Sequence, residues 1–460
     1  MASASTAAAG PDRSTLRRIT LAALAGTSIE WYDFFIYGTA AALVFGEIFF
    51  PGQTPLLGTL LAFSTFWAGF LGRPIGGVIF GHLGDRYGRK PILVTALLLM
   101  GTATVLIGLL PTAATIGFAA PIILVTLRFA QGLAIGGQWG GAVLLLTEYA
   151  SNDRRGFYGS FAQIGVPVGV ITGNTIFLGL TAVLSNEQFV AWGWRVPFLL
   201  SALLIAVALY IQLRIEDTPV FRQLQERQER QQASQQQERA GMMEVFRHHK
   251  KQVVLAAGAF FVVNGAFYIL ITGILDYGTR ELGLEQNSVL MAVLISSFFG
   301  ILAIPAFSAL SDRVGRRAVY LPGAVLLGVW AFPLFWLVDT GSLVLITVAL
   351  VVAQVFLSMM YGPQAALYAE MFSAKVRYSG ASLGYQLTAV FAGGPAPAIM
   401  LGLLEITGTS LSVSFYILAM AIITFVSVYL ITETVQEDFT EAPSADQGDP
   451  EPVAGRQEDT

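Results

Sequence analysis

The sequence contains no cysteine among its 460 residues, has only three histidines, and carries few charges, with 12% Asp, Glu, Lys and Arg. The absence of cysteine excludes disulfide bonds and thiolate metal sites. A soluble domain usually has about a quarter charged residues, so the composition disfavours a soluble globular protein. The formal net charge of −4 argues against a nucleic-acid partner. The chain is instead rich in hydrophobic residues, at 55%.

Long apolar runs recur along nearly the whole chain and are separated by short polar stretches. Each is about 20 residues or more, enough to cross a bilayer as a helix. The runs lack the alternation of barrel strands, and the bilayer interior offers no water to backbone groups, so helices are expected. We therefore predict an all-α membrane protein with twelve transmembrane helices. The expected spans are 19–45, 56–80, 91–110, 121–148, 158–183, 193–213, 252–277, 288–310, 318–338, 342–369, 381–404 and 410–432.

Lysine and arginine are distributed unevenly between the two sides that alternating spans create. Those in loops fall on one side, with Arg195 and Arg280 as exceptions. Cytoplasmic loops carry an excess of Lys and Arg. We therefore expect a multi-pass protein of the cell membrane with both termini in the cytoplasm.

Two similar loop segments indicate an internal duplication. GHLGDRYGRK at 81–90 and SALSDRVGRR at 308–317 each follow an even-numbered span, about half the chain apart. This predicts two pseudo-symmetric six-helix bundles. The predicted division is a cytoplasmic N-terminal tail at 1–18, a first bundle at 19–213, a cytoplasmic linker at 214–251, a second bundle at 252–432 and an acidic disordered cytoplasmic tail at 433–460.

Ionisable residues deep in the predicted spans are confined to the first half: Glu30, Asp33, Arg73 and Arg128. A charge at membrane depth is unfavourable unless it is paired or hydrated, so each is a candidate for function. On a helix, Glu30, Asp33 and Tyr37 fall within about 60° of one another. This division predicts charge chemistry in the first half and neutral contacts in the second. The deep polar residues of the second half are Asn264, Tyr268, Thr272, Gln354, Gln364, Tyr385 and Gln386.

Several longer motifs together indicate a family. They are EWYDFFIYG at 30–38, GRPIGGVIFGHLGDRYGRKP at 72–91, RFAQGLAIGGQWGGAVLL at 128–145, GWRVPF at 193–198, RIEDTPVF at 214–221, YGPQAALYAEMF at 361–372 and VRYSGASLGYQL at 376–387. With these motifs the chain resembles the metabolite:proton symporters of the major facilitator superfamily, whose members carry proline and betaine, shikimate, α-ketoglutarate or citrate. The resemblance implies a secondary active transporter that takes up a small polar metabolite with protons by alternating access.

The deep polar positions and the resemblance together predict the site. Proton coupling is assigned to Asp33, Glu30 and Arg128. Many members of the family have Glu where this chain has Gln138, so a carboxylate mechanism at that position fails here. Asp33 and Glu30 are the remaining acids. Candidates for substrate binding are Tyr37, Arg73, Arg128, Gln131, Gln138, Asn264, Tyr268, Gln364, Tyr385 and Gln386.

The duplicated loops predict a gating latch on the cytoplasmic side, as the resemblance implies. The alternative is that these loops only fix topology. Two further alternatives concern buried charges: Asp33 forms a permanent ion pair with an arginine, or Arg73 extends to the membrane surface. The latch candidates are Gly84, Asp85, Arg86, Gly88, Arg89, Glu148, Asp312, Arg313 and Arg316.

The solute is less well defined than the transport class. Two deep arginines favour an organic acid such as shikimate or α-ketoglutarate, while the aromatic first span keeps a proline or glycine betaine symporter open. A transport-inactive solute sensor of the same fold is a third possibility. No Gly-x-x-x-x-Gly-Lys-Ser/Thr motif occurs and no histidines cluster with acids, so neither an ATP-driven pump nor an enzyme is predicted. We expect no metal or cofactor, the proton as coupling ion, and a monomer.

We predict that Asp33→Asn abolishes uphill uptake, because an amide cannot take up and release a proton in the range where a carboxyl does. Solute accumulation in vesicles under an imposed pH gradient measures this. Normal accumulation by the variant would remove Asp33 from the coupling, and no accumulation by the unaltered protein would favour the sensor.

Overall fold

The computed structural model describes residues 13–87, 89–136, 146–147, 150, 152–215, 250–372 and 377–432, and this part of the chain is helical almost throughout, without β-strands. The prediction of an all-α protein is confirmed. The tail at 433–460 and nearly all of the linker at 214–251 lie outside the described residues.

The first half contains six long helical segments, some of them interrupted. They are α1 Arg13–Ala40, continued by η1 Ala41–Phe45 and α2 Gly46–Phe49; α3 Pro55–Tyr87; α4 Arg89–Leu109; α6 Ala119–Gly136, preceded by α5 Ala113–Ile116; α8 Arg155–Val183, preceded by η2 Asn152–Arg154; and α10 Arg195–Ile215, preceded by α9 Asn186–Gln188 and η3 Phe189–Gly193. α1 begins within the segment 1–18 that was expected to be a tail.

The second half also contains six. They are α13 Lys250–Ala259, followed by α14 Phe261–Tyr268, η5 Ile269–Gly273, α15 Ile274–Asp276 and η6 Tyr277–Glu281; α16 Gln286–Val314; α17 Arg316–Val338; α18 Leu343–Met371; α19 Arg377–Thr388, followed by η7 Ala389–Gly393 and α20 Ala396–Thr407; and α21 Leu411–Leu430.

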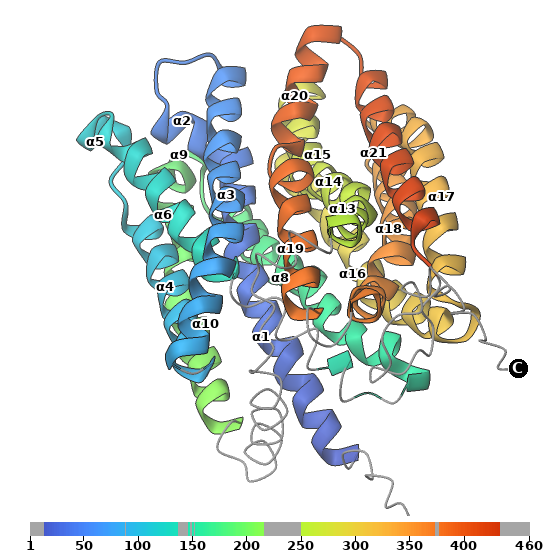
Figure 1. Ribbon diagram of the computed structural model, residues 1–460. Helices are drawn as coiled ribbons and strands as arrows, with labels where there is room; N and C mark the ends of the chain where they lie inside the picture. The colour runs from blue at the N-terminus through green and yellow to red at the C-terminus, as the bar shows by residue number, and fades with distance from the viewer. Residues whose placement is uncertain are drawn as a thin grey trace, which may run out of the picture.

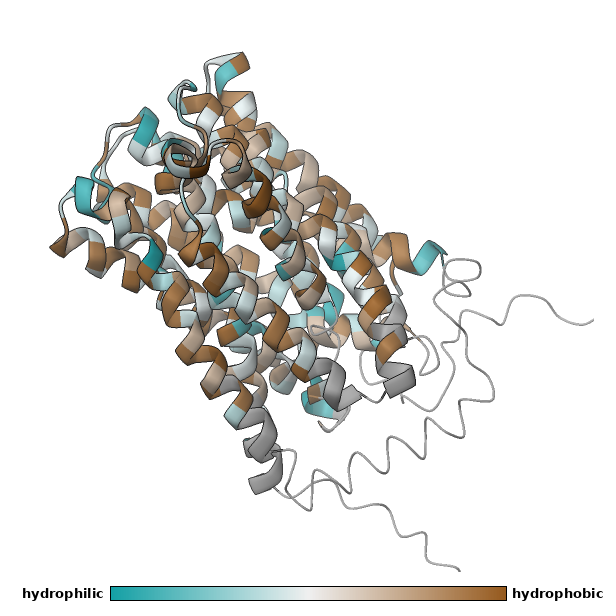
Figure 2. Ribbon diagram, turned by 90° about the vertical axis from the view of Figure 1, so that its left-hand side faces the viewer, coloured by the Kyte–Doolittle hydropathy of each residue, from teal (hydrophilic) through white to brown (hydrophobic). Residues whose placement is uncertain are grey.

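Within the described residues, ten helices are long and apolar enough to cross a membrane, and an eleventh is the pair Asn186–Gly193 and Arg195–Val207, bent by 43°. The shorter apolar helix Val94–Leu109 is consistent with the twelfth. Large hydrophobic side chains such as Leu203, Phe298 and Trp336 are more than half exposed, as expected of side chains that face lipid. Figure 2 shows hydrophobic residues along the whole length of the helices.

The helices form two groups, one from each half of the chain, with α8 and α1 reaching beneath the gap between them in Figure 1. α8 packs against α16 and α18 of the second group, and α3 packs against α19, η7 and α20. Two bundles that meet through a few helices provide the architecture that alternating access requires.

A seam of glycines brings α3 and α6 into backbone contact. A Cβ added at Gly132 would lie 1.9 Å from the Gly69 carbonyl oxygen, and one added at Gly76 would lie 1.9 Å from the Leu133 carbonyl oxygen. Small residues on facing sides of two helices allow this close approach of their backbones. The seam also gives room to Arg128, whose Nε lies 2.8 Å from the place of a Cβ on Gly69.

Gly132→Ala is expected to destabilise the protein, because the added methyl forces α3 and α6 apart; overpacking of this kind typically costs about 1–3 kcal/mol. The apparent melting temperature in detergent measures the loss. Gly402→Ala on α20 is the matched control, since nothing lies within 4 Å of its added Cβ. Equal melting temperatures for the two variants would contradict the tight seam.

Candidate functional site

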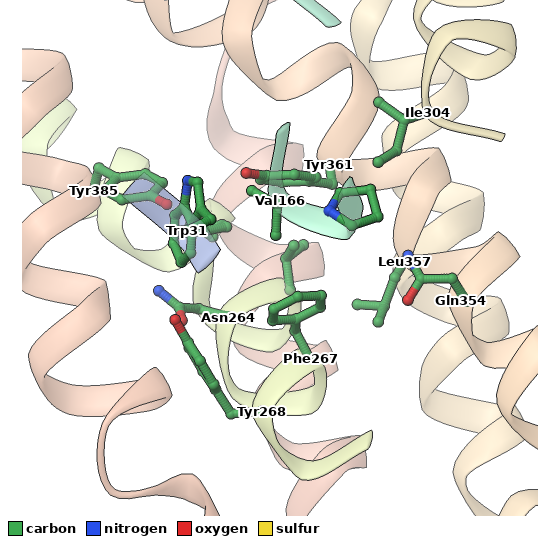
Figure 3. A pocket seen from close by; sticks show the side chains of 13 residues that line it. Trp31, Val166, Asn264, Phe267, Tyr268, Ile304, Gln354, Leu357, Tyr361 and Tyr385 are labelled. Atoms are coloured by element: carbon green, nitrogen blue, oxygen red, sulfur yellow. The ribbon is translucent and has the colours of Figure 1, made fainter. Parts of the chain in front are cut away.

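A small cavity lies where the two bundles meet, and most of its wall comes from the second half. Figure 3 shows the lining side chains, of which aromatic residues form the largest group. Its aromatic residues are Trp31, Phe260, Phe267, Tyr268, Tyr361 and Tyr385, its amides are Asn264 and Gln354, and its remaining residues are Val166, Pro167, Val263, Ile304 and Leu357. The predicted substrate residues Asn264, Tyr268 and Tyr385 are thus brought together.

The bundles are in contact on both sides of this cavity. α8 touches the second bundle near its first turn, where Gly156 N–H donates to Asp312, and near its last, where Thr181 bonds to Asn287. The cavity measures about 30 Å³, room for one or a few water molecules rather than for an organic solute. A metabolite can therefore bind there only after the residues around the cavity have moved apart.

Arg73 lies beside the cavity with its charge held by aromatic rings. Its guanidinium carbon is 4.3 Å from the ring centre of Phe34, 4.6 Å from that of Phe70 and 5.5 Å from that of Trp31. The side chain is only 1% exposed, and its Nε and Nη2 have no hydrogen-bond partner. Arg73 therefore does not extend to the surface, and two of its N–H groups are available to an anion.

Glu30 occupies the same region as Arg73. Its Oε1 is buried without a hydrogen-bond partner. Its carboxyl is within electrostatic reach of Arg73 on α3 and of Tyr361 and Tyr385 in the second bundle. Glu30 thus faces the junction of the bundles.

Arg128 is buried deeper, inside the first bundle. Its guanidinium carbon lies 4.1 Å from the ring centres of both Phe34 and Tyr37 and 4.9 Å from that of Phe66. Nη1 donates to Gln131 Oε1 at 2.9 Å. Cation–π contacts of this kind are worth about 2 kcal/mol each when desolvated, so the rings stabilise a charge that has no carboxylate partner among the described residues.

Asp33 lies in the interior of the first bundle rather than at the cavity. Ser201 Oγ donates to its Oδ1 at 2.5 Å, and Oδ2 has no hydrogen-bond partner. Although Arg128 is near enough to act on it electrostatically, the two form no ion pair in the described structure. The alternative of a permanent Asp33–Arg128 pair is therefore not what the fold contains.

The remaining predicted substrate residues do not line the cavity. Tyr37 shares a hydrogen bond of 2.6 Å with Thr65 and stacks on Arg128. Glu30, Asp33 and Tyr37 therefore lie on one face of the helix, but each contacts different side chains. Gln364 and Gln386 are buried outside the lining. Gln138 lies outside the described residues.

A charged cluster joins the bundles at one end, here called the Arg316 end. Arg316 Nη1 contacts Asp312 Oδ1 at 2.6 Å, and its Nη2 and Nε contact the two oxygens of Glu370 at 2.9 and 3.2 Å. Asp312 accepts the backbone N–H groups of Gly156 and Phe157, at 2.8 and 2.9 Å. A carboxylate at the first turn of α8 is stabilised by the helix dipole, so the second bundle holds the start of α8.

Two of the predicted latch residues of the second half, Asp312 and Arg316, belong to this cluster, whereas Arg313 is exposed and is absent from its contacts. Glu370 was missed, although it ends the fourth helix of its half as Glu148 was expected to end the fourth of the first. The first-half copy lies outside the residues whose side chains are described. It comprises Gly84, Asp85, Arg86, Gly88, Arg89 and Glu148.

Other residues of the site carry no local signal in the sequence and were not predicted. Trp31, Phe267 and Tyr361 line the cavity, but an aromatic residue in an apolar helix is equally suited to lipid or core. Ser201 and Thr104 are single hydroxyls in apolar runs, and only the packing of α10 and α4 around α1 and α6 gives them polar neighbours.

Comparison with known proteins identifies the fold. Residues 23–397 match the family model of the Major Facilitator Superfamily. The chain belongs to this superfamily. It is 39% identical to the shikimate transporter of Escherichia coli over 92% of this chain and 97% of that one. It is 31% identical to the proline/betaine transporter of Salmonella typhimurium, over 94% and 87%.

Solved structures of the superfamily agree in fold. The proton:xylose symporter XylE bound to 6-bromo-6-deoxy-D-glucose has a TM-score of 0.71 at 17% identity, over 93% of this chain and 98% of that one. A partially occluded inward-open form of XylE has a TM-score of 0.69. The resemblance to the metabolite symporters of the superfamily is confirmed, and the protein is a multi-pass membrane transporter rather than an enzyme.

Asp312→Asn is expected to loosen the transporter at the Arg316 end. A hydrogen bond to a charged group is worth about 1.5–3 kcal/mol, so the contact should open about tenfold more often. Because the chain has no cysteine, a single Ala365→Cys reports the opening by its labelling rate; Ala365 is buried and faces Gly159 of α8.

Asp153→Asn is the matched control, because the Asp153–Arg154 pair near the start of α8 is exposed, at 66% for each side chain. Labelling that is equally fast in both variants would contradict a holding role for Asp312.

Proposed function

We propose that this transporter takes up a small organic acid, such as shikimate or α-ketoglutarate, together with protons. The proton is the coupling ion, no cofactor takes part, and the working unit is a monomer in the cell membrane with both termini in the cytoplasm. The separation of charge in the first bundle from neutral cavity residues in the second supports this proposal, as does the 39% identity to a shikimate transporter.

The observation that carries the substrate class is the state of Arg73. It is a fully buried guanidinium next to the cavity wall, held by rings and retaining free N–H groups. A planar guanidinium suits a carboxylate, which it can bind through two parallel hydrogen bonds. A bound carboxylate would also neutralise a charge that lacks an ion-pair partner in the described structure.

Asp33 supports the coupling part of the proposal. A carboxyl that is buried among neutral hydroxyls and has no bound cation is poised to gain or lose a proton when its surroundings change. Arg128 is close enough to supply that change if it moves. Glu30, at the junction of the bundles, is the second candidate for carrying a proton.

A second solute class, the zwitterionic betaines and proline, is favoured by the aromatic cavity wall. Six rings surround the space, and aromatic faces bind quaternary ammonium groups. The proline/betaine transporters among the relatives are also consistent with it. An organic acid remains the better proposal, because Trp31 of the wall already faces the cation of Arg73, and a quaternary ammonium group beside it would be repelled by that charge.

The test is uptake by the purified protein in proteoliposomes with an inwardly directed proton gradient. Shikimate and α-ketoglutarate should be concentrated, and the uptake should collapse when the gradient is dissipated. Accumulation of glycine betaine or proline in preference to both acids would replace the proposal with its alternative.

Arg73→Lys is expected to weaken the apparent affinity for the carried acid by about tenfold or more, since an ammonium cannot form the two parallel hydrogen bonds of a guanidinium. The KM of uptake and the ligand-induced thermal shift both measure this. Arg17→Lys, the same change on an exposed site of α1, should leave the KM unchanged. If Arg73→Lys also retains the KM, Arg73 does not bind the substrate.

A further inference from the structure

Gln131 is the side chain that holds Arg128, although Asp33 lies close by. Both residues are on α6, one turn apart, and the Gln131 carbonyl oxygen accepts from Arg128 Nη1 at 2.9 Å. The remaining Nε and Nη2 of Arg128 have no hydrogen-bond partner. The rings of Phe34 and Tyr37 cover the guanidinium. Arg128 is therefore directed to a neutral amide while keeping N–H groups free for a carboxylate.

The other end of Gln131 is fixed in turn. Its Nε2 donates to Thr104 Oγ1 at 2.7 Å, and the Thr104 hydroxyl donates to the Met100 carbonyl oxygen at 2.9 Å. All of these groups are buried. Because each end of the amide has a partner, rotating Gln131 away from Arg128 would break a second hydrogen bond.

Thr104 also lies beside the Asp33 carboxyl, so one hydroxyl connects the amide to the acid. Oδ1 of Asp33 accepts from Ser201, whereas Oδ2 has no hydrogen-bond partner, and no arginine pairs with the carboxyl in the described structure. A buried carboxylate without a cation beside it is unfavourable. This arrangement suits a protonated Asp33 with Arg128 turned away.

We propose that Gln131, anchored by Thr104, is a positioning residue that keeps Arg128 away from Asp33 while Asp33 carries its proton. When Asp33 gives that proton to water, the guanidinium leaves Gln131 and pairs with the new carboxylate. The strength of the Gln131 contacts then sets the pH at which the exchange occurs. The role in transport rests on the proposed proton coupling, whereas the exchange itself does not depend on the solute.

The charged and titratable groups around this exchange come from several helices. Asp33 faces Arg128 of α6 and Tyr32 of its own helix, while α4 and α10 present the hydroxyls of Thr104 and Ser201. Arg128 is within electrostatic reach of Arg73 on α3, Tyr37 on α1 and Tyr268 on α14. Gln131 is the one member of the network that contacts Arg128 by a hydrogen bond within the described residues.

The experiment follows the protonation of Asp33 by infrared spectroscopy of the purified full-length protein. The carboxyl C=O band that is lost in Asp33→Asn is titrated with pH. Gln131→Met keeps the length of the side chain but removes the amide. In this variant Arg128 can approach Asp33 without first breaking its hydrogen bond to residue 131. An arginine next to a carboxyl favours the ionised form, so the midpoint should move to lower pH by about one unit, a tenfold change in proton concentration.

Thr104→Val should move the midpoint in the same direction, and Thr104→Ser, which restores the hydroxyl, should return it. Thr126→Val is the matched control, since Thr126 is on an exposed face of α6 and bonds only to the Ile122 carbonyl in the described structure. If Gln131→Met does not fold, the comparison of Thr104→Val with Thr104→Ser is sufficient to test the proposal. An unmoved midpoint in the variants that fold, or an Asp33 band absent at every pH, would overturn the proposal.

The outcome is independent of the proposed substrate. If shikimate is not concentrated but the Asp33 band shifts as expected, the proposed function fails and the positioning role stands. If shikimate uptake is proton-driven and the band does not shift, the positioning role fails alone. When shikimate is not concentrated, the pH dependence of the Asp33 band, which is measured without solute, still supports the positioning role of Gln131.

Discussion

The burial of Arg73 and Arg128, which have no carboxylate ion-pair partner among the described residues, is the constraint on which the structure of this transporter depends. A guanidinium at membrane depth is costly unless other groups replace its hydration. Here Phe34 lies between the two, 4.3 Å from Arg73 and 4.1 Å from Arg128, and further rings complete each environment. The glycine seam between α3 and α6 provides the space in which the Arg128 side chain lies. The rings hold the charges in place while leaving N–H groups unused.

The buried charges of the first bundle lie in two regions. Arg73 and Glu30 lie at the junction of the bundles, beside the cavity, whereas Arg128 and Asp33 lie deeper in the first bundle. The second bundle supplies most of the cavity wall, with rings and amides in place of charges. Phe34 contacts both guanidinium groups and is therefore a direct physical connection between the two regions.

The contacts between the bundles extend along the length of α8, and the cavity between them is small. Among the described residues, the two bundles are therefore in contact at both ends of α8. The Arg316 end is held by buried ionic hydrogen bonds, whereas the opposite end includes the neutral Thr181–Asn287 contact. The two ends thus differ in the contacts that must break before each can open. At the Arg316 end these are hydrogen bonds to the buried carboxylate of Asp312, whose desolvation energy is large.

The sequence by itself determined the number of spans, the duplication and the identity of the buried charges, because hydropathy, repeats and membrane-depth charges are local properties of the chain. It also placed Glu30, Asp33 and Tyr37 on one helix face. Only the tertiary structure decided the partners. Asp33 bonds to Ser201 of α10 rather than to Arg128, and Asp312 holds the start of α8, more than 150 positions earlier in the chain. These partners depend on how helices distant in sequence are rotated and packed against one another, which no periodicity within a single helix specifies.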